Sequence, residues 1–242
     1  MLSMISNLVK RYNKWGWRWF FVDFYEYIIK FQYNKYIRGE LAMKKLVSDY
    51  QFETVLDIGC GNGSASRFFT EHGKVVTACD YGRSVSFKDT MAKDVIIGDF
   101  NTLDFGDKKY DCIWCSHVLE HQLNVQSFLE KINSLLAEGG VLCVTVPPYK
   151  NQTLGGHVSW WSRGMLLYRL VLAGFDCTDA EICRYGYNIS AIVKKKSISI
   201  LNLLSYDGGD MMIIKNYLPR SIKYRDTGRD VLIYGDRINI WH

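Results

Sequence analysis

Short apolar runs alternate with amphipathic stretches along the middle of the chain. The apolar runs have the length of buried β-strands and occupy residues 54–58, 74–79, 95–97, 110–115 and 141–146. Helical patterns fit between and after them, at residues 63–72, 81–88, 123–137 and 161–173, with Gly139-Gly140 and Gly174 as stop signals. Strands that alternate with helices predict βαβ units and therefore a parallel sheet.

The two ends of the chain add different elements. The first 50 residues are rich in Trp, Phe and Tyr, contain no proline and predict two or three helices, the last over residues 38–50. Strands at residues 175–183 and 188–194, joined through Tyr185-Gly186, predict an antiparallel pair at the edge of the sheet. A further hairpin is expected between residues 231–234 and 237–241, around Gly235-Asp236.

Together these elements predict an α/β fold with a Rossmann-like, doubly wound and mostly parallel seven-stranded sheet that has an antiparallel edge strand. We expect an N-terminal helical cap or lid over residues 1–50 and a core domain over residues 51–196. A C-terminal extension that contains the hairpin should cover residues 197–242. A chain of 242 residues is long enough for one such domain with additions.

Composition and charge narrow the class of protein. The apolar fraction of 48% is that of a globular chain, and no run approaches the roughly 20 apolar residues that cross a bilayer. Seven cysteines, mostly inside the predicted strands, indicate buried thiols in a reducing compartment, so we expect a cytoplasmic protein. Residues 1–38 hold seven basic and two acidic side chains, which accounts for a charge excess as large as the net charge of +5.

A glycine-rich loop follows the first predicted strand. Gly59, Gly61 and Gly63 give a tight turn from which backbone N–H groups can approach a nucleotide-like ligand closely. Dinucleotide binders need a third glycine one position later, where this chain has Ser64. The spacing therefore argues against a dinucleotide, and taken alone the loop could also be an ordinary strand-to-helix turn.

The segment from Asp57 to Gly63 resembles the first motif of class I S-adenosylmethionine-dependent methyltransferases, and the resemblance extends over residues 54–194. It implies S-adenosyl-L-methionine as the cofactor, with Asp80 on the ribose hydroxyls and Asp99 on the adenine amino group. The cofactor-binding residues that it implies are Asp57, Gly59, Cys60, Gly61, Gly63, Asp80, Tyr81, Asp99, Phe100, Ser116 and His117. From the residues alone, Asp80 and Asp99 could instead be helix N-caps.

Two motifs suggest other chemistry. His117 to His121 matches the inverted zinc-protease pattern H-x-x-E-H, but it directly follows a predicted strand, whereas that site needs a helix and a third ligand. Cys112 and Cys115 match C-x-x-C, yet residues three apart on a strand point to opposite faces, which favours core packing over redox chemistry. Methyl transfer from a sulfonium requires no metal, and we expect none.

If the acceptor is a hydroxyl, a positioned base must take its proton. His157 follows the fifth predicted strand at the carboxyl end of the sheet and is the first candidate. His121 and His117 lie in the neighbouring loop, where Glu120 could orient one of them, and His72 is expected to cap a helix on the far side. A loop histidine bonded only to backbone is the alternative for His157.

The acceptor is less defined than the cofactor. Residues 147–196 and the segment from Tyr206 to Asp210 resemble, less specifically, methyltransferases of bacterial cell-surface polysaccharide biosynthesis, which implies O-methylation of a sugar or glycan. Tyr149, Trp160 and Trp161 could form a face for a ring or belong to the core. The alternatives are a quinone precursor, an amine or another small molecule as acceptor, or a non-catalytic, cofactor-binding interaction protein.

The basic N-terminus bears on the partners of the protein. It could attract an anionic or lipid-linked acceptor or make a peripheral membrane contact, or it could serve only as a lid. No nucleic acid is expected, because no nucleic-acid-binding module is recognisable. A homo-oligomer is left open.

Overall fold

The computed structural model describes residues 38–84, 87, 95–227, 231–235 and 238–241. The predicted cap therefore lies outside the described residues except for its last helix, α3 (Glu40–Asp49), which matches the expected helix over residues 38–50. Among the described residues, no helix is both long and apolar enough to cross a bilayer.

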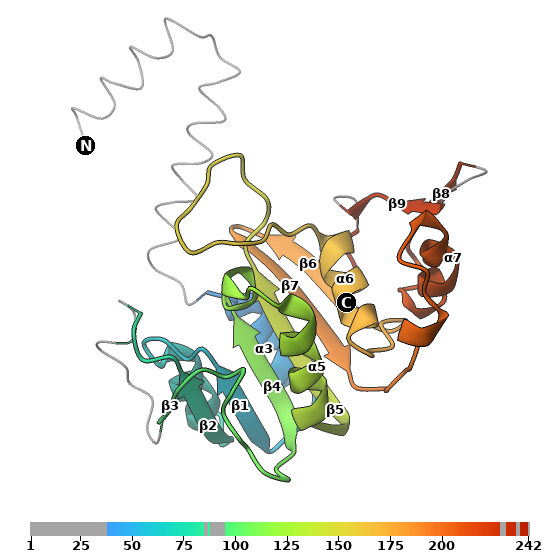
Figure 1. Cartoon of the computed structure of the whole chain (residues 1–242). Coiled ribbons are helices and arrows are strands. Elements are labelled where there is room, and N and C mark those ends of the chain that lie inside the picture. Colours follow the sequence, from blue (N-terminus) through green and yellow to red (C-terminus); the bar gives the residue numbers. More distant parts are fainter. Residues whose placement is uncertain (1–37, 85–86, 88–94, 228–230, 236–237, 242) are drawn as a thin grey trace, which may run out of the picture. The chain divides into compact units, whose positions relative to one another are not determined.

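Seven strands form one sheet in the order β3-β2-β1-β4-β5-β7-β6 (Figure 1). They are β1 (Thr54–Ile58), β2 (Val75–Asp80), β3 (Val95–Ile97), β4 (Tyr110–Ser116), β5 (Leu136–Val146), β6 (Glu181–Tyr185) and β7 (Asn188–Lys194). The first five are parallel, and β7 is antiparallel to both β5 and β6. This confirms the predicted Rossmann-like fold, including the antiparallel pair at one edge.

The central strands have apolar side chains on both faces because helices cover both sides of the sheet. In β4, Cys112, Ile113, Trp114 and Cys115 are each at most 1% exposed. In the sequence, strands buried on both faces appear as continuous apolar runs rather than as alternating apolar and polar residues. The described cysteines are free thiols, as expected, and Cys112 and Cys115 are both buried.

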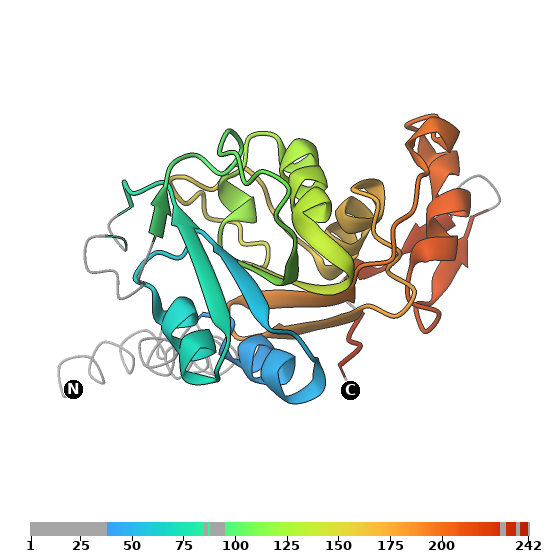
Figure 2. The same cartoon turned by 90° about the horizontal axis from the view of Figure 1, so that it is seen from below.

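The helices form two layers. Helices α5 (Val125–Leu135) and α6 (Arg163–Leu172) lie on one face, and α3 and α4 (Ser64–Glu71) lie on the other (Figure 2). Asn124 and Ser162 begin α5 and α6 as N-caps, since their side chains accept the N–H groups of Ser127 and Met165.

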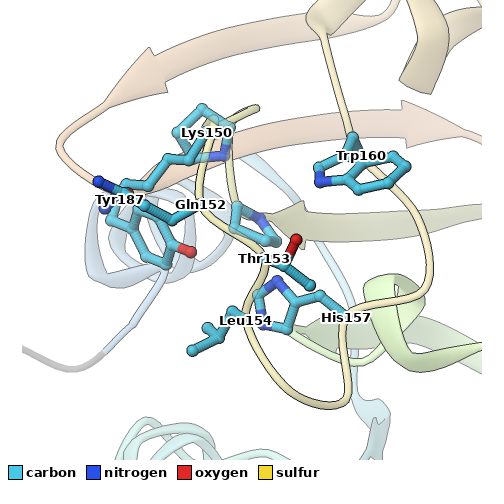
Figure 3. Close-up of a pocket in the computed structure, with 9 residues that line it drawn as sticks. Lys150, Gln152, Thr153, Leu154, His157, Trp160 and Tyr187 are labelled. Carbon is cyan, nitrogen blue, oxygen red and sulfur yellow. The ribbon is translucent and has the colours of Figure 1, made fainter.

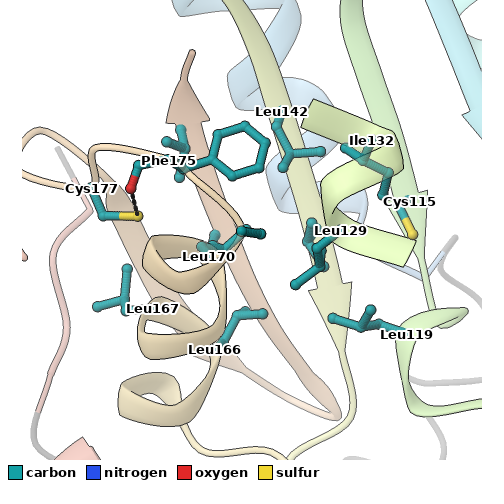
Figure 4. Close-up of a cluster of buried hydrophobic side chains, with 14 of the residues drawn as sticks. Cys115, Leu119, Leu129, Ile132, Leu142, Leu166, Leu167, Leu170, Phe175 and Cys177 are labelled. Carbon is teal, nitrogen blue, oxygen red and sulfur yellow. Dashed lines mark hydrogen bonds between the residues drawn. The ribbon is translucent and has the colours of Figure 1, made fainter. Parts of the chain in front are cut away.

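The core under α5 and α6 is apolar and fully enclosed. Leu129 and Ile132 of α5 meet Leu166 and Leu170 of α6 above Leu142 of β5, and all five side chains are 0% exposed (Figure 4). The C-terminal segment contributes to the same cluster through Ile200, Ile214, Leu218, Ile222 and Ile238. Its elements are the short helix α7 (Met211–Ile214) and the antiparallel strands β8 (Tyr224–Asp226) and β9 (Val231–Ile233).

The junction between α5 and β5 corrects one prediction. The helix ends at Leu135 and the strand begins at Leu136, so neither the helix to residue 137 nor its stop at Gly139-Gly140 is observed. The reason is pairing with Lys195, whose backbone donates to Gly140 and accepts from Gly139. The Lys195 ammonium also donates to the carbonyls of Asn133 and Leu136 at 2.8 and 2.9 Å, which caps the helix end.

Three further element predictions need correction. Residues 81–84 are not helical, because the Asp80 carboxylate accepts the N–H of Gly82 and bends the chain; residue 87 apart, the rest of the predicted helix lies outside the described residues. The predicted strand over 175–183 begins only at Glu181. The C-terminal hairpin exists, but β9 pairs with β8, while Ile240 pairs with Ile182 at the edge of the main sheet.

Candidate functional site

The glycine loop joins β1 to α4 at the carboxyl edge of the sheet. The N–H groups of Gly59 and Cys60 donate to the carbonyl of Cys79 at 2.8 and 3.1 Å, so the loop is tied to the neighbouring strand β2. Gly59 has a φ of 70°, and a Cβ placed there would lie 2.3 Å from a methyl carbon of Val118. Only glycine therefore lets the loop approach the segment that follows β4.

Asp80 ends β2 and faces the glycine loop. Its two carboxylate oxygens accept the N–H groups of Gly61 and Gly82 at 2.9 and 2.8 Å, and the residue is 8% exposed. A carboxylate has about four lone-pair positions, so each oxygen retains capacity for a further donor. These bonds orient Asp80 at the edge of the loop, where the hydroxyl groups of a ribose could donate to it.

Asp57 supports the loop from within β1. It is 1% exposed, and the Ser66 hydroxyl of α4 donates to its carboxylate at 2.5 Å. Burial raises the pKa of Asp57 to about 6, and the Ser66 hydrogen bonds oppose part of this rise. Its side chain therefore holds the start of α4 rather than lining the surface of the site.

The other residues expected to bind the cofactor are distributed around the same edge. Asp99 accepts from the backbone and the side chain of Asn101 in a tight turn after β3. Phe100 is 7% exposed and packs on Phe105 and Phe128 in the core, so its ring is part of the core cluster. Tyr81 is 53% exposed.

The segment after β4 contains a strained residue. His117 has a φ of 56°, which is uncommon outside glycine, and its N–H donates to the carbonyl of Thr145. The neighbouring Ser116 hydroxyl, at the end of β4, is buried without a hydrogen-bond partner.

The ring of His117 bridges Asn188 and Glu120. The Asn188 amide nitrogen donates to the carbonyl of Tyr185, so its oxygen faces His117 Nε2 at 2.9 Å and accepts from it. His117 Nδ1 then faces Glu120 Oε1 at 3.2 Å. The ring of Tyr187 stacks on that of His117 with centroids 5.9 Å apart.

His121 and His157 also lie beside Glu120. The His121 ring bonds the carbonyl of Gly156 through Nδ1 at 2.7 Å, and its Nε2 lies 3.9 Å from Glu120 Oε1. The rings of His121 and His157 meet edge to face, with centroids 5.0 Å apart. Partial burial lowers the pKa of His157, against an opposing attraction from Glu120. The predicted candidates for the base are thus brought together around one buried carboxylate.

A pocket of about 140 Å³ opens beside His157 (Figure 3). Its lining consists of Pro147, Pro148, Lys150, Gln152, Thr153, Leu154, His157, Trp160 and Tyr187. Pockets that bind drug-sized ligands measure about 300–1,000 Å³, so this smaller pocket suits a single ring or part of a larger acceptor. Trp160 is 57% exposed at the pocket, whereas Trp161 is 2% exposed in the core.

Sequence reasoning missed Lys150, Tyr187 and Asn188. Tyr187 lies in the tight turn between β6 and β7, and Asn188 is the first residue of β7. Lys150 Nζ lies 4.2 Å from the centroid of the Tyr187 ring. Because β7 runs antiparallel to β5, its first residues lie at the carboxyl end of the parallel strands. The predicted antiparallel pair could have indicated these residues, because the turn between its strands lies at the edge of the sheet where ligands bind.

His72 is placed as predicted. It is the C-cap of α4, and its ring bonds the carbonyl of Phe68. The H-x-x-E-H segment forms a single short turn over Leu119–His121 rather than an α-helix, and its two histidines bond to different elements. That geometry does not form the zinc-protease site.

Comparison with known proteins decides the family. A family model described as a methyltransferase domain matches residues 33–176, more than half of the chain. The chain belongs to this methyltransferase family. The glycine loop, Asp80 and the segment after β4 all lie inside the matched region, and S-adenosyl-L-methionine is the cofactor of the class I methyltransferase domain that they form.

Individual relatives are similar over shorter regions. A malonyl-[acyl-carrier protein] O-methyltransferase of Enterobacter lignolyticus is 26% identical over 98 residues, 39% of each chain. A ubiquinone biosynthesis O-methyltransferase of Coxiella burnetii is 29% identical over 115 residues, 45% of this chain and 46% of that protein. The chain thus spans less than half the length of these curated relatives.

Solved structures share the fold. The 1,6-didemethyltoxoflavin-N1-methyltransferase of Burkholderia thailandensis, crystallised with 1,6-didemethyltoxoflavin and S-adenosylhomocysteine, superposes with a TM-score of 0.51 at 21% identity. The match covers 61% of this chain and 72% of that one. At this identity the likeness establishes the architecture of the domain.

Proposed function

We propose that the protein transfers a methyl group from S-adenosyl-L-methionine to a hydroxyl of a sugar or glycan intermediate, by direct displacement. The observation that carries the proposal is the pocket beside His157, which combines an exposed tryptophan, a tyrosine, a lysine and a histidine at the carboxyl edge of the sheet. Aromatic faces suit the apolar side of a sugar ring, and polar groups around them suit its hydroxyls.

Lys150 favours an anionic acceptor. Its ammonium lies over the Tyr187 ring at the pocket, where it can also attract a phosphate. A nucleotide-linked or lipid-linked sugar carries such a phosphate next to the ring that is methylated. The involvement of the basic N-terminus, a peripheral membrane contact, a homo-oligomer and a cytoplasmic location stay predictions, as does the division into cap, core and extension.

The bound cofactor supplies an electrophilic methyl group on a sulfonium. The residues of this chain are assigned as follows: Asp80 accepts from the ribose hydroxyls, the turn at Asp99 faces the adenine, and the backbone at Ser116 and His117 faces the methionine part. The glycine loop lets its backbone N–H groups approach the cofactor closely. These roles fit the orientation of Asp80 and the lone pairs that it has left.

His157 is the proposed general base. It lines the pocket, and its lowered pKa means that the neutral ring, which can accept a proton, is the dominant form near pH 7. Glu120 lies behind it and attracts the cation that forms. His117 and His121 are assigned positioning roles, since each is already bonded to Asn188 or Gly156.

Two alternatives keep the cofactor but change the outcome. The relatives include O-methyltransferases of other acceptors, and one structural neighbour is an N1-methyltransferase, so a quinone precursor or an amine are the competing acceptors. A non-catalytic protein that binds the cofactor and acts through interaction is the remaining alternative.

A screen with methyl-labelled cofactor distinguishes these acceptors. The purified full chain is incubated with nucleotide sugars, with catechols and with amines, and label in each product is counted. We expect transfer to a sugar hydroxyl and at least a hundredfold loss of rate in His157→Ala, within the about 10²–10⁴-fold contribution of a positioned base. His72→Ala, which removes an exposed histidine far from the pocket, should retain the rate. Transfer only to phenols or amines would overturn the sugar assignment, and cofactor binding without any transfer would favour the interaction protein.

A further inference from the structure

Three potential metal ligands converge beside the pocket. Donor atoms of Glu120, His121 and His157 all lie within 4.8 Å of one another. Glu120 and His121 end the short turn after β4, whereas His157 comes from the long loop between β5 and α6. The backbone N–H of Val158 donates to the carbonyl of Glu120 at 2.9 Å, which holds the two segments together.

The carboxylate of Glu120 is buried without hydrogen-bond donors. The residue is 0% exposed, and neither carboxylate oxygen has a hydrogen-bond partner, although His117 Nδ1 lies 3.2 Å from Oε1. A buried carboxylate that lacks donors is strongly unfavourable unless a positive charge compensates it. The Glu120 carboxylate therefore keeps acceptor capacity that a cation could use.

The tautomer of His121 is set for ligation. Its Nδ1 must donate its hydrogen to the carbonyl of Gly156, since a carbonyl oxygen only accepts. Nε2 is then left with a free lone pair on the side of Glu120, 3.9 Å from Oε1. Histidine ligands in metal sites are oriented by the same kind of bond from the second ring nitrogen.

We propose that Glu120, His121 and His157 bind one divalent first-row transition metal ion, of which Zn²⁺ is the representative, with an open coordination position toward the acceptor pocket. Two imidazoles and one carboxylate are the donor set that such ions prefer, whereas Mg²⁺ and Ca²⁺ favour oxygen ligands. Ligand bonds of about 2.0–2.2 Å place donors roughly 3–3.5 Å apart, so side-chain shifts of about 1 Å complete the site. It differs from the H-x-x-E-H pattern, because His117 is bonded elsewhere.

The ion would act on the acceptor. This inference rests on the proposed function and changes the role of His157 from base to ligand, and it departs from the expectation that no metal is needed. An acceptor hydroxyl that coordinates the ion becomes more acidic. As its oxygen bonds the methyl carbon, the carbon–sulfur bond breaks, the thioether leaves with that electron pair, and the hydroxyl proton passes to water.

Metal binding is tested without any acceptor. The untagged full chain is freed of metal by a chelator and titrated with Zn²⁺ by calorimetry, and with Co²⁺ by visible absorption, which reports a site with nitrogen and oxygen ligands. We expect one ion per chain and an affinity at least about tenfold weaker in His157→Ala, His121→Ala and Glu120→Gln. His72→Ala is the matched control and should bind as the wild-type chain does.

The outcomes are distinguishable from those of methyl transfer. Absence of saturable binding at 0.1 mM ion, on the order of one hundred times a micromolar dissociation constant, overturns the metal site, as does unchanged affinity in His157→Ala. Either result leaves His157 as the base of the proposed reaction. A bound ion together with absent methyl transfer would reject the proposed function alone. If circular dichroism shows that Glu120→Gln does not fold, the two histidine variants still test the metal site, because their side chains are partly exposed.

Discussion

The carboxylate of Asp80 accepts the backbone N–H of Gly61 at 2.9 Å, which ties the end of β2 to the middle of the glycine loop. The second oxygen accepts from Gly82, so one side chain fixes two turns at the carboxyl edge of the sheet. A ligand that donates hydroxyl hydrogens to this carboxylate meets an acceptor that is already oriented.

Asp80→Ala should weaken the binding of S-adenosylhomocysteine by roughly 1–3 kcal/mol, about 5- to 150-fold, because charge-assisted hydrogen bonds to the ligand are lost and the loop is released. Calorimetry measures the change. Asp107→Ala removes an exposed acid away from the loop and should leave the affinity unchanged. Equal affinities in the two variants would contradict the ribose role of Asp80.

Gly59→Ala should destabilise the protein more than Gly73→Ala does. Both glycines have positive φ, 70° and 75°, so each substitution carries about 1–2 kcal/mol of backbone strain. A Cβ on Gly73 meets nothing within 4 Å, whereas one on Gly59 overlaps Val118 and adds about 1–3 kcal/mol. Denaturant unfolding gives both free energies, and only Gly59→Ala should also weaken cofactor binding. Similar values for both variants would refute the steric role of Val118.

Asp57→Asn should change how stability depends on pH. The pKa of Asp57 is raised to about 6 by burial from an ordinary value of 3.8, so the folded state binds more protons than the unfolded state between these values. The wild-type chain therefore loses stability as pH rises through this window, and the asparagine variant lacks this loss. Unfolding free energies at pH 5 and 7.5 should show the wild type losing about 1–2 kcal/mol relative to the variant. A parallel pH dependence would show that Asp57 is not buried as a titrating acid.

Trp160→Ala should raise the KM for the acceptor about 3- to 10-fold with little change in kcat. Its ring lines the pocket and is 57% exposed, so its removal takes away ring contact worth about 0.5–1.5 kcal/mol without opening the core. Tyr149→Ala, also exposed at 61% but outside the pocket lining, is the control. A change confined to kcat would place Trp160 in the chemical step instead of in acceptor binding.

The sequence predicted those parts of the site that depend on local order. Gly59 to Gly63 and Asp80 follow strands whose register fixes where they emerge, so their positions at one edge followed from the strand pattern. The end of α5 could not be predicted in this way. Ala137 and Glu138 are good helix formers, yet pairing with the distant Lys195 places them in a strand.

The cluster around Glu120 also could not be predicted from local sequence, because its two segments are far apart in the chain. The sequence identified His117, Glu120, His121 and His157 as candidates, but it did not indicate that the loop of His157 folds back onto Glu120. Contacts of this kind depend on packing between segments far apart in the chain, and no periodicity records them. The absence of donors to Glu120, which motivates the metal site, is visible only in three dimensions.

The turn between β6 and β7 has a consequence for how such an enzyme can diversify. Tyr187 lines the proposed acceptor pocket and Asn188 bonds His117, both from the antiparallel edge of the sheet. The glycine loop and Asp80 emerge from its parallel half. The parallel and antiparallel halves of the sheet contribute to one hydrophobic core, whereas each half has its own loops. Selection can therefore remodel this turn and exchange one acceptor for another, while the machinery that supplies the methyl group is inherited unchanged.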